Sequence, residues 1–76
     1  MIEYAITFKD KSGINEEFSE SKRVILDIAK ENKESDVHQI FWKKYKTVDG
    51  EPVETWVEIL YDKRMGINKG IKFKGK

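Results

Sequence analysis

The stretch that decides the fold lies between residues 37 and 61 and reads VHQIFWKKYKTVDGEPVETWVEILY. Two segments rich in β-branched and aromatic residues flank the dipeptide Asp49-Gly50. Asp-Gly between two such segments is the strongest short-range signal for a β-hairpin with a two-residue turn. Pro52, which has no backbone N–H, fits the beginning of the second strand. The sequence therefore predicts a long antiparallel hairpin.

A two-residue turn also predicts which residues of the hairpin face each other, and therefore which side chains share a face. The predicted pairs are Ile40–Ile59, Phe41–Glu58, Trp42–Val57, Lys43–Trp56 and Tyr45–Glu54. The predicted core face carries Ile40, Trp42, Val53, Val57, Ile59 and Tyr61. The predicted outward face carries Phe41, Lys43, Tyr45, Glu54, Trp56, Glu58 and Leu60.

A strand is also predicted near the amino terminus. Ile2, Tyr4, Ile6 and Phe8 are separated by single residues, which is the period-two pattern of a strand with one buried face. The cluster that follows, residues 10–13, is rich in turn-forming residues, and its glycine tolerates positive φ. The chain is therefore expected to reverse direction there.

Residues 14–32 allow two interpretations. One is a single long amphipathic helix. The other is a second strand over residues 14–18, followed by a helix that ends near Lys33. We favour the second, because Ser19 or Ser21 would cap the shorter helix, whereas serine inside a helix stabilises it little. The side chains expected to face the core from this helix are Val24, Ile25, Ile28 and Ala29.

The carboxyl-terminal tail is strongly basic. Residues 63–76 carry six bases and no acid, whereas the chain before them carries nine bases and 14 acids. The apolar residues of the tail all fall at odd positions; they are Met65, Ile67, Ile71 and Phe73. This alternation favours a short fifth strand at a sheet edge, where lysines discourage aggregation. The alternative is a tail whose lysines contact the phosphates of a nucleic acid.

Together these segments predict a small α+β domain in which one helix covers an antiparallel sheet. The expected order is β-β-α-β-β over residues 1–62, with residues 63–76 as a terminal edge strand or tail, and the alternative order is β-α-β-β. A chain of 76 residues holds no second core. The absence of cysteine fits a reducing compartment, and no segment resembles a membrane span or a secretory leader. We therefore expect a cytoplasmic protein.

No arrangement of residues in the sequence predicts catalysis. His38 is the only histidine and has no orienting carboxylate or nucleophile at a suitable spacing, so we expect it on the solvent side. Glu54 and Glu58 lie about 13 Å apart along a strand, too far for a hydrolytic pair. Residues 65–72 resemble a phosphate-binding loop only faintly, because the glycine spacing and the lysine position differ. We expect no enzyme, no metal site and no cofactor.

The aromatic residues on the predicted outward face indicate a binding module, because exposed aromatic patches usually mark interaction sites. The leading hypothesis is a protein partner or a second copy of the chain, bound by Phe41, Lys43, Tyr45, Trp56 and Glu58. The alternative is a nucleic-acid-binding module in which aromatic rings stack on bases and lysines contact phosphates. Its candidate residues are Lys43, Lys44, Lys46, Lys69, Lys72, Phe73 and Lys74.

Overall fold

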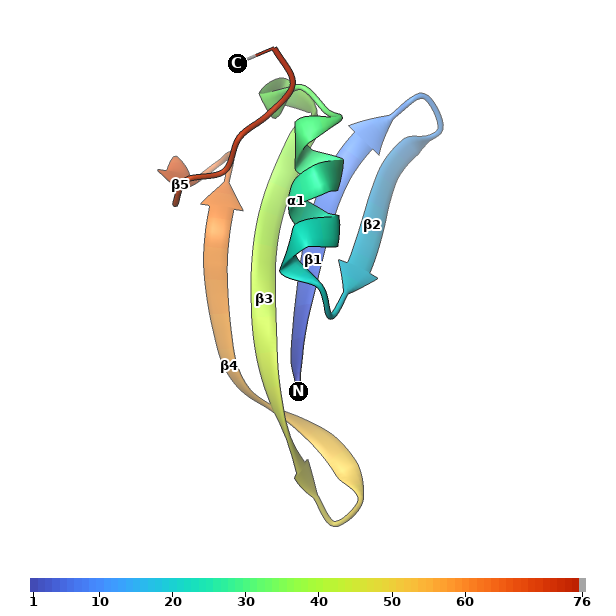
Figure 1. Ribbon diagram of the computed structural model, residues 1–76, viewed down its shortest axis with the longest axis vertical. Helices are drawn as coiled ribbons and strands as arrows, with labels where there is room; N and C mark the ends of the chain where they lie inside the picture. The colour runs from blue at the N-terminus through green and yellow to red at the C-terminus, as the bar shows by residue number, and fades with distance from the viewer. Residues whose placement is uncertain (76) are drawn as a thin grey trace.

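A five-stranded antiparallel sheet forms most of the molecule, which a computed structural model describes from residue 1 to residue 75. The elements are β1 (Ile2–Asp10), β2 (Gly13–Ser19), α1 (Lys22–Lys30), a short 3-10 turn η1 (Glu34–Asp36), β3 (Val37–Val48), β4 (Glu51–Asp62) and β5 (Ile67–Asn68). The strands lie in the order β2-β1-β3-β4-β5, so that β3 is central (Figure 1). The predicted α+β class is confirmed, with the second strand and the fifth strand present. The alternative order β-α-β-β is wrong.

Helix α1 begins where the serines predict. The Oγ of Ser21 accepts a hydrogen bond from the N–H of Val24 at 3.4 Å, and the Oγ of Ser19 accepts one from the N–H of Ser21 at 3.0 Å. The helix ends before the predicted Lys33, because the side-chain amide of Asn32 donates to the carbonyl of Ile28 at 2.8 Å and closes the last turn.

The face of α1 that packs on the sheet is narrower than predicted. Ile25 and Ala29 are fully buried, and Ile28 is half-buried. Val24 is exposed, contrary to the prediction, because it projects about 100° around the helix from Ile25. The helix contacts β1 and β2, which leaves the lower half of the hairpin uncovered.

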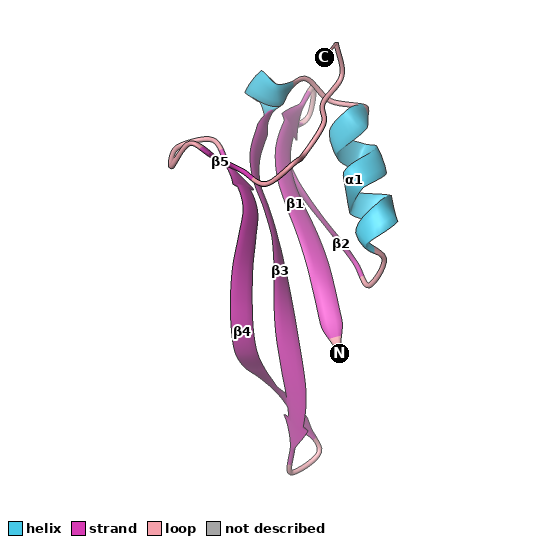
Figure 2. Cartoon of the chain, turned by 60° about the vertical axis from the view of Figure 1, so that its left-hand side comes forward, coloured by secondary structure: helices cyan, strands magenta, loops and turns pink. Residues whose placement is uncertain are grey.

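The tail completes the core on the same side of the sheet as α1. The buried cluster consists of Ile6, Ile25, Ala29, Val37, Ile40, Leu60, Tyr61, Ile71 and Phe73. The ring of Phe73 meets the ring of Tyr61 edge-on, with centroids 4.8 Å apart. The N–H of Lys74 donates to the carbonyl of Asn32 at 2.9 Å, which ties the tail to the end of α1 (Figure 2). The tail therefore contributes to the core beyond the two residues of β5 that pair with β4.

The hairpin turn forms as predicted. Asp49 and Gly50 have φ angles of 52° and 79°, and a two-residue hairpin turn with two positive φ angles matches the twist of the strands it joins. Tyr45 lies opposite Glu54, which confirms that predicted pair.

Two β-bulges change the register farther from the turn. Thr55 and Leu60 each stand in β4 without a residue opposite them in β3. The pairs beyond the first bulge are Lys44–Trp56, Lys43–Val57, Trp42–Glu58, Phe41–Ile59 and, beyond the second, Ile40–Tyr61. The other four predicted pairs are therefore wrong, because each extra residue shifts one strand against the other.

The bulges also correct the predicted faces. Val57 and Ile59 leave the predicted core face and lie opposite Lys43 and Phe41 on the other side of the sheet. Val53 is exposed rather than buried. Leu60, predicted to point outward, belongs to the core, whereas Ile40, Trp42 and Tyr61 lie on the core side as predicted.

A buried carboxylate ends β4. The Oδ1 of Asp62 accepts hydrogen bonds from the N–H groups of Met65 and Arg64, both at 2.9 Å. Its Oδ2 accepts one from the side-chain amide of Gln39 at 2.8 Å. These bonds, the one from Met65 first, hold the pKa of Asp62 below its ordinary value of 3.8.

The lowered pKa predicts an acid-sensitive contribution to stability. The Asp62 carboxylate stabilises the folded state above pH 3.8, and this contribution is lost as the pH falls through the lower pKa of the folded state. We expect Asp62→Ala to lower the melting temperature at neutral pH and to flatten its fall in acid. Circular dichroism melts from about pH 7 to about pH 2.5 measure both effects. The exposed Glu51→Ala serves as control, and equal behaviour of the two variants would contradict the prediction.

Candidate protein-interaction surfaces

The hairpin of β3 and β4 projects beyond the rest of the sheet. The ladder between β1 and β3 ends where Ile2 lies opposite Lys44, and backbone hydrogen bonds join Met1 to Tyr45 just past it. From there only two strands continue to the turn, and they give the molecule its 45 Å long axis. We call residues 44–56 the arm.

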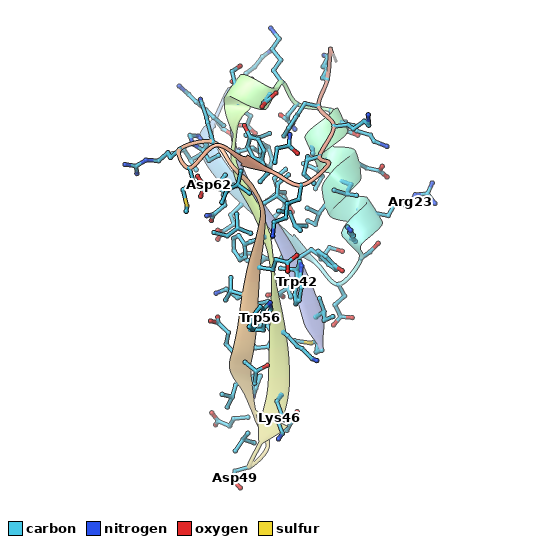
Figure 3. All side chains as sticks on the ribbon, turned by 90° about the vertical axis from the view of Figure 1, so that its left-hand side faces the viewer. Arg23, Trp42, Lys46, Asp49, Trp56 and Asp62 are labelled. Carbon is cyan, nitrogen blue, oxygen red and sulfur yellow. The ribbon has the colours of Figure 1, made fainter. Side chains whose placement is uncertain are left out.

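One face of the arm carries exposed apolar side chains. The extra residues of both bulges belong to β4, so side chains alternate regularly along β3 from Ile40 to Val48. Lys44, Lys46 and Val48 therefore lie on the same side of the sheet as α1. Trp56 lies opposite Lys44 and is 57% exposed, and Val53 lies opposite Lys46. Figure 3 shows Trp56 between Trp42 and Lys46 along the molecule. Neither α1 nor residues 63–75 of the tail extend over this part of the hairpin.

The opposite side of the sheet, which we call the open face, carries a row of apolar residues. The register places Phe18, Ala5, Phe41 and Ile59 side by side across four strands. Ala5 is buried, Phe41 and Ile59 are half-buried, and Phe18 is exposed. No helix lies on this face within residues 1–75 (Figure 2).

An ion pair lies beside this row. The Nζ of Lys43 is 2.9 Å from an Oε1 of Glu54 and 5.6 Å from the ring centroid of Phe41. The hydrogen bond to Glu54 raises the pKa of Lys43. The predicted contact between Lys43 and Trp56 is therefore wrong.

The structure divides the predicted partner-binding residues between two surfaces. Phe41, Lys43 and Tyr45 lie on the open face. Trp56 and Glu58 lie on the other side, because the extra residue Thr55 exchanges the faces of β4 relative to the prediction. The carboxylate of Glu58 faces the tail, with an oxygen 4.0 Å from the Nζ of Lys69.

The residues proposed for nucleic acid are likewise dispersed. Phe73 is only 4% exposed, so its ring does not offer a stacking surface. The exposed lysines fall into two separated groups, Lys44 and Lys46 on the arm and Lys72 and Lys74 on the tail near the other end of the molecule. Lys43 and Lys69 lie beside glutamates, as described above.

Exposed apolar residues on β2 were missed by the sequence reasoning. Ile14 and Phe18 alternate with polar residues, which predicts a strand but not the side that is covered. Both are exposed on the open face, opposite Lys9 and Ala5. Only the position of α1 on the other side of the sheet reveals this, and no local signal in the sequence does.

His38 is half-buried rather than on the solvent side. It is an extra residue of β3 at a bulge in the ladder with β1, between the pairs Thr7–Gln39 and Phe8–Val37. Its Nε2 is buried without a hydrogen-bond partner among the described residues. A pocket of about 290 Å³ adjoins it, lined also by Thr7, Gln39, Asp62 and Arg64. In residues 1–75 no cluster of three or more histidine or acidic side chains is arranged to hold a metal. Nor does that part of the chain contain a helix long and apolar enough to cross a membrane.

Known proteins provide no assignment for these surfaces. Comparison with protein families, with curated proteins and with solved structures finds no match to this chain. The arm and the open face are therefore the features from which a function is inferred.

Proposed function

We propose that this chain is a small, non-enzymatic protein-interaction module whose contact element is the arm, with Trp56 as its anchor. The observation that carries the proposal is the 57% exposure of this tryptophan on a ribbon of two strands. Tryptophan is among the residues most enriched at interface positions that dominate binding energy, and such positions are usually surrounded by a polar rim. Lys44 and Lys46 lie across the ribbon from the apolar residues and supply that rim.

The distribution of exposed apolar residues supports the same element. Of the ten large exposed apolar side chains in residues 1–75, three lie on the arm; they are Val48, Val53 and Trp56. A two-stranded hairpin alone is marginally stable in water. A partner that covers the arm would therefore stabilise the ribbon and remove its apolar surface from water at the same time.

Charge supports a protein partner over a polyanion. The net charge of the chain is only +1, and acidic residues such as Asp49 and Glu51 occupy the tip of the arm beside its lysines. Steep electrostatic attraction to phosphates requires several cations on one surface. Nucleic-acid binding stays a prediction without a supporting observation in the structure.

Trp56→Ala tests the proposal. Proteins retained by the immobilised chain from a lysate of its native host are quantified for the wild type and the variant. We expect the specifically retained partner to be lost, with an affinity reduced by about 30-fold or more, because truncation of an anchor costs about 2 kcal/mol or more. Circular dichroism should be unchanged, since the side chain is mostly exposed.

The matched control is Val24→Ala, which removes an apolar side chain of similar relative exposure from α1 instead of the arm. It should leave retention unchanged. Retention that survives Trp56→Ala, or that Val24→Ala reduces to the same extent, would exclude the arm as the contact element.

A further inference from the structure

The two outer edges of the sheet differ in how they are protected. β2 pairs with β1 through an unbroken register from Ser19 opposite Tyr4 to Gly13 opposite Asp10. Within residues 1–75 no strand pairs with its other edge. Natural edge strands are usually blocked by proline, by charged residues such as lysine, or by bulges. Residues 13–19 contain no proline, lysine or bulge, and their only charges are those of Glu16 and Glu17.

The edge of β4 is protected, by contrast. Pro52 lies near its beginning, and the extra residues Thr55 and Leu60 interrupt its register. β5 pairs with its last two residues, Tyr61 and Asp62. The regular, open edge of the sheet is therefore that of β2.

The charge of this edge is uniformly negative. Glu16, Glu17 and Glu20 lie on β2 or directly after it, and residues 12–21 contain no base. None of these three carboxylates forms an ion pair within residues 1–75. The only side-chain hydrogen bond to Glu16 in that part of the chain comes from the hydroxyl of Thr7, at 3.3 Å.

Apolar side chains flank this charge. Ile14 and Phe18 share the open face with Glu16 and are 70% and 52% exposed. The surface therefore offers a carboxylate between two apolar side chains, next to backbone groups that can accept another strand.

We propose that the free edge of β2 binds an extended, lysine- or arginine-bearing segment of a partner protein as a sixth strand. Main-chain hydrogen bonds would supply affinity, as in other cases of strand addition, and alternate side chains would supply selectivity. Glu17, on the side of the sheet that α1 covers, selects cationic side chains, whereas Ile14 and Phe18, on the open face, accept apolar ones. Pairing of two β2 edges from two copies is disfavoured, because it would place Glu16 and Glu17 of both chains close together. The proposal does not depend on the arm.

Binding is tested with a fluorescein-labelled peptide in which lysine and valine alternate over about eight residues, the length of a typical strand. A peptide with glutamate in place of lysine serves as the comparison. We expect the lysine peptide to bind the full-length chain at low salt at least about tenfold more tightly than the glutamate peptide. Hydrogen exchange should show new protection of the amides in residues 13–19 when the lysine peptide is bound.

Two charge variants distinguish this edge from general electrostatic attraction. Glu16→Lys with Glu17→Lys should reduce affinity for the lysine peptide by about tenfold or more. Glu31→Lys with Glu51→Lys makes the same change in net charge at exposed positions outside β2 and should change affinity by less than about twofold. Trp56→Ala should also leave this affinity unchanged, which keeps the test separate from that of the arm.

Three results would overturn the proposal. One is binding of the two peptides with equal affinity, or no binding at all. Another is protection that appears elsewhere but not in residues 13–19. The third is an equal loss of affinity in the two charge variants, because it would show attraction to the whole chain rather than to the edge of β2.

Discussion

Replacing Phe73 by alanine is expected to leave most molecules of the protein unfolded at room temperature. The side chain is 4% exposed and packs edge-on against Tyr61 in the same cluster as Ile71. Truncation of a buried phenylalanine costs about 3–5 kcal/mol, because transfer energy is lost and a cavity remains. A chain of this size has a stability of about 5 kcal/mol or less when no disulfide or metal supports it. The substitution therefore removes most or all of the free energy of folding.

Urea denaturation followed by circular dichroism measures this loss. Lys72→Ala is the matched control, since Lys72 is the exposed neighbour of Phe73 on the same segment. It should change the denaturation midpoint little. If Phe73→Ala unfolds at the same urea concentration as Lys72→Ala, the tail is not part of the core.

The features that sequence reasoning predicts correctly are those set by local chemistry. Asp49-Gly50 specifies the turn because both residues take positive φ there. Ser21 specifies the start of α1 because its hydroxyl satisfies an N–H of the first turn. The alternation from Ile2 to Phe8 specifies a strand with one covered side. Each of these signals lies within a few residues of the structure that it determines.

The bulges are a different case. Thr55 and Leu60 are ordinary strand residues, and nothing beside them in the sequence indicates that they have no partner in β3. The register depends instead on which apolar residues α1 and the tail can bury. An unbroken hairpin would place Val57 in the core, whereas the bulged hairpin buries Leu60. That choice also moves Trp56 from the open face to the other side of the arm.

The candidate surfaces depend on the same long-range packing. β2 lies at the edge of the sheet because β1 pairs with it on one side and with β3 on the other. The sequence of residues 13–19 does not reveal this order of strands. The tail likewise alternates as an edge strand would, yet most of it leaves the sheet after Asn68 to cover the core. The aromatic residues of the predicted outward face indicated a binding module, but only the arrangement of the strands shows which residues share a surface.

The pair Leu60→Ala and Val57→Ala tests the bulged register directly. Leu60 is 6% exposed and Val57 is 43% exposed. We expect Leu60→Ala to cost about 2–5 kcal/mol, as for other buried leucines. Val57→Ala should cost less than about 1 kcal/mol, because Val57 keeps 43% of its surface exposed and lies outside the buried cluster. Both values follow from urea denaturation of the two variants.

An unbroken hairpin predicts the opposite order, with Val57 the costly position and Leu60 the tolerant one. That result would return Trp56 to the open face, beside Phe41 and Tyr45, and the contact surface would then be the aromatic face of the sheet. The loss of stability in Leu60→Ala and in Val57→Ala therefore decides on which side of the sheet Trp56 lies. A large cost at Leu60 with a small one at Val57 leaves Trp56 on the side of the arm that faces away from Phe41 and Tyr45, with Lys44 opposite it.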